Sequence, residues 1–131
     1  MRQLRLPPIE AIIDLHAEWI TEFGGAPGLR DRGSLEGSLG RAGQVMAYES
    51  DAEISVIAAA VCASICRNHP FVDGNQRAAF GTLGVILGLN GLYLDVSESE
   101  ATQVMLALAA GKLAEDEYRR WVASNVFLDE A

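Results

Sequence analysis

The first predicted element is an amphipathic helix near the start of the chain. Apolar positions recur every three or four residues between Pro7-Pro8 and Gly24-Gly25, which is the spacing of one face of a helix of about four turns. His16 lies on this apolar face, where we expect a packed, hydrogen-bonded histidine and not a catalytic one. The positions on the face are Ile9, Ile12, Ile13, His16, Trp19, Ile20 and Phe23.

The segment ISVIAAAVCASIC, residues 54–66, is apolar on every side. A helix without a polar face is predicted to lie at the centre of a bundle. Ser50 or Asp51 is a suitable N-cap for it. The helix must stop before Pro70, because a proline keeps the preceding residue, His69, out of the α region.

A second apolar helix is predicted for QRAAFGTLGVILGLNG, residues 76–91, with Asn90-Gly91 as its end. Each glycine inside a helix costs up to about 1 kcal/mol relative to alanine. We therefore expect the glycines to allow close backbone approach to the preceding helix. They share one stripe and are Gly81, Gly84 and Gly88.

A glycine-rich segment, GGAPGLRDRGS, follows the first helix and shows no periodicity. It is either a plain connection or a loop that covers a site, and its charges at Arg30, Asp31 and Arg32 leave both possibilities open. Ser34 resembles an N-cap for a short helix through Leu35 and Leu39.

The remaining segments also favour helices. Residues Leu92 to Val96 are predicted to be extended, and Ser97 with Glu100 resembles a capping box for a helix that Gly111 ends. A last helix is expected from about Glu115 to Asn125, with Tyr118, Trp121 and Val122 inward. The whole chain, residues 1–131, is therefore predicted to be one all-α domain, a compact bundle of about six helices.

Composition narrows the class of protein. With 131 residues, 50% of them hydrophobic, the chain can bury a core and is not disordered. The formal net charge of −8 argues against a surface that binds nucleic acid through phosphate neutralisation. The N-terminus lacks the apolar stretch of a secretory signal, and the longest uncharged run, Ala78 to Leu94, is shorter than a membrane span.

Two cysteines, Cys62 and Cys66, lie four residues apart in an apolar helical segment. We interpret them as small buried hydrophobic residues and not as a metal or redox pair, since a metal site needs more ligands nearby. Reduced thiols and the absent signal indicate a cytoplasmic protein.

The stretch NHPFVDGNQRAAF, Asn68 to Phe80, carries the candidate chemistry. Arg77 stands near a helix N-terminus, which is unfavourable for a cation unless an anion lies beside it. The amides of Gly74 to Arg77 form an anion site at that helix start. If the anion is a phosphate, Asp73 can share a magnesium ion with it, and the imidazole of His69 can take a proton from an incoming hydroxyl. Together these residues describe a phosphate-transfer site.

A purely structural interpretation uses the same residues differently. Asp73 and Asn75 can cap the helix, and His69 can bond to a backbone carbonyl. We expect Phe71 and Val72 to be buried in the core in either case. Capping requires one polar side chain, whereas several types converge on this turn, which favours the functional interpretation.

The sequence His69-Pro70-Phe71-x-Asp73-Gly74-Asn75-x-Arg77 resembles the signature of the Fic/Doc proteins, the filamentation and death-on-curing group. The resemblance covers most of the chain and is stronger to the death-on-curing branch, through the Phe-Gly-Gly that ends the first helix, GLRDRGSLEGSL and NGLY. It implies a compact α-helical fold with the site at the start of the helix after the motif.

The resemblance also implies roles for these residues. His69 would assist the target hydroxyl, Asp73 would bind Mg²⁺, and Gly74, Asn75, Gln76 and Arg77 would hold the phosphates of ATP. Death-on-curing toxins transfer the γ-phosphate, with elongation factor Tu as the target of the type member, and a partner antitoxin of the Phd kind silences them.

Two positions depart from the family pattern. Fic enzymes that transfer AMP carry a second arginine where this chain has Phe80, and the death-on-curing branch generally carries lysine where it has Gln76. We therefore expect a toxin that phosphorylates a hydroxyl on a translation factor. The alternatives are transfer of AMP or another nucleotide, and a degenerate module that binds a nucleotide or protein without catalysis.

Overall fold

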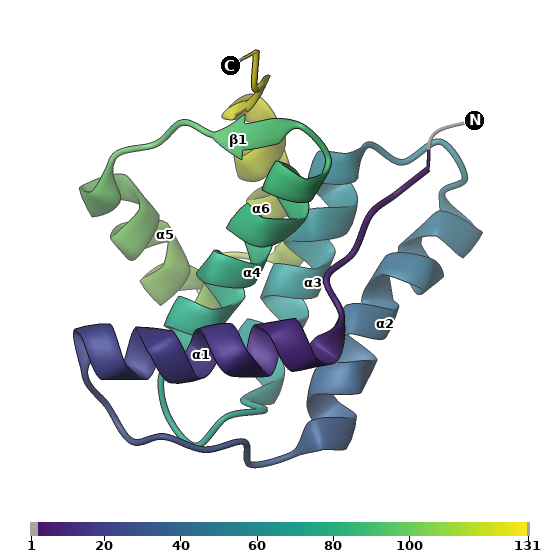
Figure 1. Ribbon diagram of the computed structural model, residues 1–131. Coiled ribbons are helices and arrows are strands. Elements are labelled where there is room, and N and C mark those ends of the chain that lie inside the picture. The colour runs from purple at the N-terminus through teal and green to yellow at the C-terminus, as the bar shows by residue number, and fades with distance from the viewer. Residues whose placement is uncertain (1–2, 131) are drawn as a thin grey trace.

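The computed structural model describes residues 3–130, which form six helices and one two-stranded sheet (Figure 1). The predicted all-α architecture of six helices is confirmed. None of these helices combines the length and hydrophobicity that a membrane crossing requires. In chain order the elements are α1 (Ile9–Phe23), α2 (Arg32–Tyr48), α3 (Ile54–Asn68), α4 (Asn75–Leu89), β1 (Leu92–Leu94), α5 (Glu98–Ala109), α6 (Glu115–Ser124) and β2 (Val126–Leu128).

Helix α3 is the centre of the core, as its apolar sequence predicts. Residues 57–66 are all buried, and α3 packs against α2, α4 and α6. Helix α1 crosses in front of this group (Figure 1). Cys62 and Cys66 are buried and unpaired, which confirms their interpretation as packing residues. Burial raises the pKa of the Cys62 thiol to about 12, so this thiol is not reactive.

Two predicted helix starts are wrong. Helix α2 begins at Arg32 with Asp31 as its N-cap, and Ser34 donates its amide to the Asp31 carboxylate at 3.0 Å instead of capping. Helix α3 begins at Ile54 after Glu53, so Ser50 and Asp51 do not cap it. A turn with a hydrogen bond from the Ala52 amide to the Glu49 carbonyl occupies the intervening residues. Helix α2, which the sequence predicted to be short, has 17 residues.

The C-terminal third agrees with the prediction except for one strand and half of a capping box. Leu92–Leu94 is extended as predicted and pairs antiparallel with β2, which the sequence did not indicate because three residues carry no periodicity. Ser97 caps α5 by accepting from the Glu100 amide at 3.1 Å. The Glu100 carboxylate instead accepts from the Trp121 indole at 2.7 Å, so only half of the predicted capping box forms. Helix α6 follows its predicted span closely.

The expected role of the glycine stripe in α4 is wrong. A Cβ on Gly81 would lie 2.2 Å from Cη2 of Trp19, so this glycine makes room for an indole of α1 and not for the backbone of α3. Gly84 and Gly88 are exposed, and a Cβ on either would meet nothing within 4 Å. Only Gly81 is therefore required by packing.

This difference predicts opposite effects of one substitution at two sites a turn apart. Gly81→Ala should lower the free energy of unfolding by about 1 to 3 kcal/mol, because the Trp19 ring must move. The matched control, Gly84→Ala, should raise it by up to about 1 kcal/mol through helix propensity. Urea unfolding of both variants measures the effects. Equal changes in the two variants would contradict the packing described.

Candidate active site

The motif loop joins the end of α3 to the start of α4, the two helices at the core. One open cavity of about 400 Å³ at this turn is lined by every residue predicted for the site. Because both helices are anchored in the core, the loop between them has a well-supported framework. The lining residues are His69, Val72, Asp73, Gly74, Asn75, Gln76 and Arg77.

His69 is the C-cap of α3 and is exposed to the cavity. Its φ of 49° and ψ of 59° lie in the left-handed region, so it leaves the right-handed α region as Pro70 requires. The left-handed conformation costs a non-glycine residue about 1 to 2 kcal/mol. The guanidinium of Arg30 donates through Nε to the His69 carbonyl at 2.8 Å and through Nη2 to the Asn68 carbonyl at 2.9 Å. These bonds satisfy carbonyls at the end of α3.

Asp73 has an exposed carboxylate that backbone amides orient. Oδ2 accepts from the Ala26 amide at 3.0 Å, and Oδ1 accepts from the Gly74 amide at 2.8 Å. The Ala26 bond and then the Gly74 bond lower the pKa of the Asp73 carboxyl below its ordinary value of 3.8. The carboxylate is therefore charged at neutral pH and retains lone pairs for a further ligand.

His16 supports the same loop from α1. Its ring is buried, stacks on Phe71 at 3.8 Å between centroids, and donates from Nε2 to the Asp73 carbonyl at 2.8 Å. The prediction of a packed, hydrogen-bonded histidine is confirmed. Phe71 is buried as predicted, but Val72 is 56% exposed, so its prediction as a core residue is wrong. Phe71 forms a backbone bridge with Leu29, and the chain then bends at Val72, which turns this side chain away from the core.

Gly74 and Asn75 shape the turn into α4. Gly74 has a φ of 71°, and a Cβ there would lie 3.0 Å from Cδ1 of Ile20, so both conformation and packing require glycine. The buried Asn75 side chain bonds to both backbone groups of Phe71, accepting from its N–H at 2.9 Å and donating to its C=O at 3.0 Å. Neither Asp73 nor Asn75 caps α4 with its side chain.

The predicted anion site has fewer available amides than the sequence suggested. The Gly74 amide bonds to Asp73, so it is not free for a phosphate. The first helical bond runs from the Ala78 amide to the Gly74 carbonyl at 2.9 Å, and Gly74 offers no side chain as a cap. The amides of Asn75, Gln76 and Arg77 thus remain at the helix start, where its dipole favours an anion.

The Asn75 bonds predict a large stability effect. Asn75→Ala leaves the N–H and C=O of Phe71 without these partners and should lower the free energy of unfolding by about 2 to 4 kcal/mol. Asn125→Ala is the matched control, because the Asn125 side chain makes one bond, to the Trp121 carbonyl at 2.8 Å. Its expected loss is about 0.5 to 1.5 kcal/mol. Chemical denaturation compares the two, and an Asn75→Ala loss no larger than the control contradicts the role assigned to these bonds.

Arg77 has a partner that the sequence did not reveal. Its Cζ lies 3.8 Å from the centroid of the Phe23 ring at the end of α1. A cation–π contact of about 0.5 to 1 kcal/mol offsets the unfavourable helix dipole at this position. Arg77 and Gln76 also border a second cavity of about 520 Å³ between α4 and α5, which Phe80 helps to line.

The donor set fits a magnesium ion that a nucleotide helps to hold. Within residues 3–130 there is no group of three or more histidine, cysteine, aspartate or glutamate side chains that could hold a metal. Magnesium, however, is commonly bound by one or two carboxylates together with phosphates and water. The Asp73 carboxylate beside the start of α4 meets this requirement.

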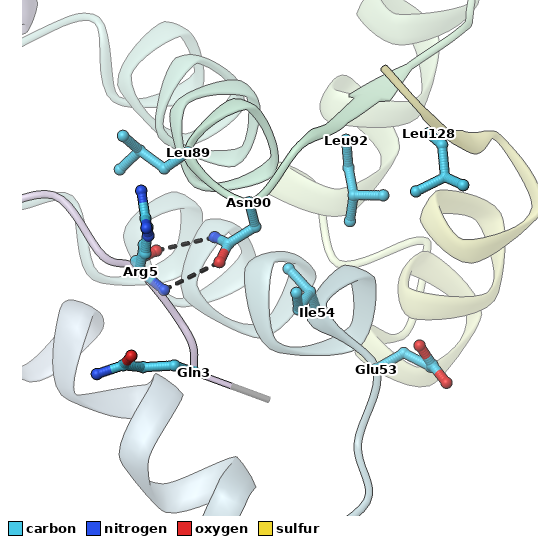
Figure 2. A pocket seen from close by; sticks show the side chains of 8 residues that line it. All are labelled: Gln3, Arg5, Glu53, Ile54, Leu89, Asn90, Leu92 and Leu128. Atoms are coloured by element: carbon cyan, nitrogen blue, oxygen red, sulfur yellow. Dashed lines mark hydrogen bonds between the residues drawn. The ribbon is translucent and has the colours of Figure 1, made fainter. Parts of the chain in front are cut away.

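Another cavity, of about 540 Å³, lies at the other end of the hairpin formed by α3 and α4 (Figure 2). There the Asn90 side chain holds the backbone of Arg5 through two bonds of 2.9 Å. None of the motif residues line this cavity. The Asn90 bonds there anchor the N-terminal segment to the end of α4. Its lining residues are Gln3, Arg5, Glu53, Ile54, Leu89, Asn90, Leu92 and Leu128.

A compact helical fold with this motif loop at the start of α4 is characteristic of a known protein family. The family model described as "Fic/DOC family" matches residues 6–87, which include α1, α2, α3 and most of α4. The chain therefore belongs to the Fic/DOC family. Two characterised relatives are similar to it and assign it to the death-on-curing branch.

"Protein kinase doc" of Escherichia phage P1 is 30% identical over 105 residues, which cover 80% of this chain and 82% of that protein. "Toxin Doc" of Mycolicibacterium smegmatis is 38% identical over 84 residues, covering 60% of this chain and 64% of that protein. The chain thus spans slightly less than two thirds of the mycobacterial relative.

Three contributors to the site were not predicted: Arg30, Ala26 and Phe23. Ala26 acts through its backbone amide, so no side-chain pattern could reveal it. Arg30 belongs to the glycine-rich segment whose charges left its role open, and the structure brings that segment against the motif loop. Phe23 was assigned only to the apolar face of α1, although it is 54% exposed.

Proposed function

We propose that this protein is the toxin of a toxin–antitoxin pair, which transfers the γ-phosphate of ATP to a hydroxyl side chain of a translation factor. The observation that carries the proposal is the convergence of His69, Asp73 and the amides at the start of α4 on one cavity. The names of the relatives, a protein kinase and a toxin, support the same activity. Elongation factor Tu is the first target to test.

The proposed reaction assigns one role to each of these groups. The target hydroxyl oxygen attacks the γ-phosphorus and forms a new O–P bond, while the bond to the bridging oxygen breaks and ADP leaves. His69 accepts the proton of the hydroxyl. Arg77 and the amides of Asn75, Gln76 and Arg77 stabilise charge on the phosphate oxygens. Atoms and charge balance without another reactant.

Asp73 would hold Mg²⁺ together with the phosphates. When bound, this ion neutralises phosphate charge and orients the transferred group. The two amide bonds to Asp73 fix the carboxylate before a ligand arrives, which reduces the reorganisation needed for the reaction.

Gln76 and Phe80 bear on the choice between this proposal and its alternatives. Phe80 gives no cation where AMP-transferring relatives have a second arginine, which favours γ-phosphate transfer over nucleotide transfer. Gln76 is a neutral donor where the branch generally has lysine, which costs about ten- to thirty-fold in rate if a charge-assisted bond becomes a neutral one. The same residue supports the second candidate, a binding module without catalysis.

The remaining expectations belong to this proposal. Residues 1–131 would act as a single domain in the cytoplasm, and an antitoxin of the Phd kind would silence the protein. The net charge of −8 favours a protein partner with basic groups and disfavours direct nucleic-acid binding.

A growth assay tests the toxin directly. Induced expression of the wild type in a bacterial host should arrest growth, whereas His69→Ala expressed to the same level should not. Coexpression of the cognate antitoxin should restore growth to the wild type. If the wild type and His69→Ala are equally harmless without a partner, the binding module replaces the toxin as the better account.

A further inference from the structure

The end of α3 receives an arginine from outside the motif. Arg30 lies in the segment between α1 and α2, yet its guanidinium donates to the carbonyls of Asn68 and His69, 38 and 39 residues away. Nη2 also donates to the His69 carbonyl, so this oxygen accepts hydrogen bonds from both Nε and Nη2 of the guanidinium. Such a fork needs the planar geometry of arginine, because lysine offers a single charged nitrogen.

His69 is the residue at which this contact matters. Among residues 3–130 it is the only non-glycine residue with a positive φ. Its own amide continues the helix with a bond to the Ile65 carbonyl at 3.2 Å, so the change of direction occurs at its φ and ψ. A strained conformation of this kind persists only where surrounding contacts fix it.

The backbone around Arg30 brings its side chain to this position. The Arg30 and Asp31 amides donate to the Pro70 carbonyl at 2.8 and 2.9 Å. The Val72 amide donates to the Gly28 carbonyl at 3.0 Å, so the two segments lie side by side. Asp31 is also the N-cap of α2, which ties the segment to that helix.

The other cation near the end of α3 is engaged elsewhere. Arg67 donates to the Glu115 carboxylate of α6 at 2.8 Å. Arg30 is therefore the arginine that satisfies the last carbonyls of α3, where the helix dipole favours a cation. Its side chain is directed to backbone groups, so its effect on the reaction passes through His69.

We infer that Arg30 is a positioning residue, which holds His69 in the left-handed conformation and thereby aims its imidazole into the cavity shared with Asp73. This inference rests on the proposed function. A displacement of a reacting group by about 1 Å costs about a hundredfold in rate. Arg30→Gln should therefore lower kcat by about 10- to 100-fold, with little change in the KM for ATP.

The test measures geometry and activity in the same proteins. Backbone ¹³Cα and ¹³Cβ shifts of His69, from NMR, report its conformation, and kcat and KM are measured with ATP and the target protein. The variants are Arg30→Gln and Arg30→Lys, which keeps the charge but not the fork. Arg32→Gln is the matched control, since Arg32 pairs with the exposed Glu10 at 2.5 Å, and within residues 3–130 no hydrogen bond or ion pair joins its side chain to the motif loop. Thermal unfolding checks that all remain folded.

We expect both Arg30 variants to move the His69 shifts away from left-handed values and to lose kcat, while Arg32→Gln changes neither. Unchanged His69 shifts in Arg30→Gln would overturn the inference even if kcat falls, because Arg30 would then act by another route. Altered shifts with a wild-type kcat would overturn it as well. A wild-type protein without transfer would refute the proposed function, and the shifts alone would then decide whether Arg30 sets the geometry of His69.

Discussion

His69→Asn should lower the rate of phosphate transfer by about 10²- to 10⁴-fold, the contribution of a general base. Asparagine is chosen because it adopts the left-handed conformation more readily than other non-glycine residues, so the φ of 49° at this position is retained. Its amide cannot accept the proton of the target hydroxyl at neutral pH. Single-turnover transfer from labelled ATP measures the effect.

The control for this variant is its stability. His69 is exposed, and the bonds at the end of α3 come from its backbone, so the unfolding midpoint of His69→Asn should be no lower than that of the wild type. A folded variant that transfers phosphate within about threefold of the wild-type rate would show that the imidazole is not the base.

Asp73→Asn should lower transfer at least about a hundredfold and remove its dependence on magnesium. The neutral amide is a poor ligand for this ion, and loss of one charge-stabilising group at a reacting centre costs about 10² to 10³ in rate. The substitution also disturbs the loop, because the amides of Ala26 and Gly74 donate to the two carboxylate oxygens. An Asn side chain has one acceptor oxygen for these two donors.

Magnesium titration of the transfer rate is the measurement. Asp116→Asn is the matched control, since Asp116 is an exposed carboxylate of α6 that lies 3.5 Å from Arg120 and contributes nothing to the cavity. Because the pKa of the Asp73 carboxyl lies below its ordinary value of 3.8, the wild-type carboxylate stays charged in mildly acidic buffer, so mild acidification should not remove the magnesium dependence of transfer. A magnesium response in Asp73→Asn equal to that of the control would exclude the proposed role.

The helices were predictable because their signals are long. The apolar face of α1 extends over 15 residues, and α3 is apolar from residue 54 to residue 66, so tertiary contacts had little to change. Helix starts depend on one hydrogen bond, and Asp31 and Ser34 offer nearly equal capping chemistry. The strand β2 was not predictable, because its three residues acquire their conformation by pairing with β1.

The site was predictable as a set of residues but not as a geometry. The motif is contiguous, so its side chains had to lie near one another, and the resemblance to a family supplied the roles proposed for them. The contacts that shape it come from α1 and the segment after it: His16 to the Asp73 carbonyl, Ala26 to its carboxylate and Arg30 to the backbone of His69. Contacts between residues so far apart in the sequence produce no local sequence pattern. A backbone amide donor, such as that of Ala26, does not depend on the side chain and therefore produces no sequence signal.

The most direct test of the central claim is transfer of label from ATP carrying it in parallel at the α or the γ phosphate. The purified protein is mixed with magnesium and elongation factor Tu, or with a translation extract. We predict label from the γ position on a protein target, and its loss in His69→Ala. Label from the α position, or no label from either, would contradict phosphate transfer, the first in favour of nucleotide transfer and the second in favour of a binding module.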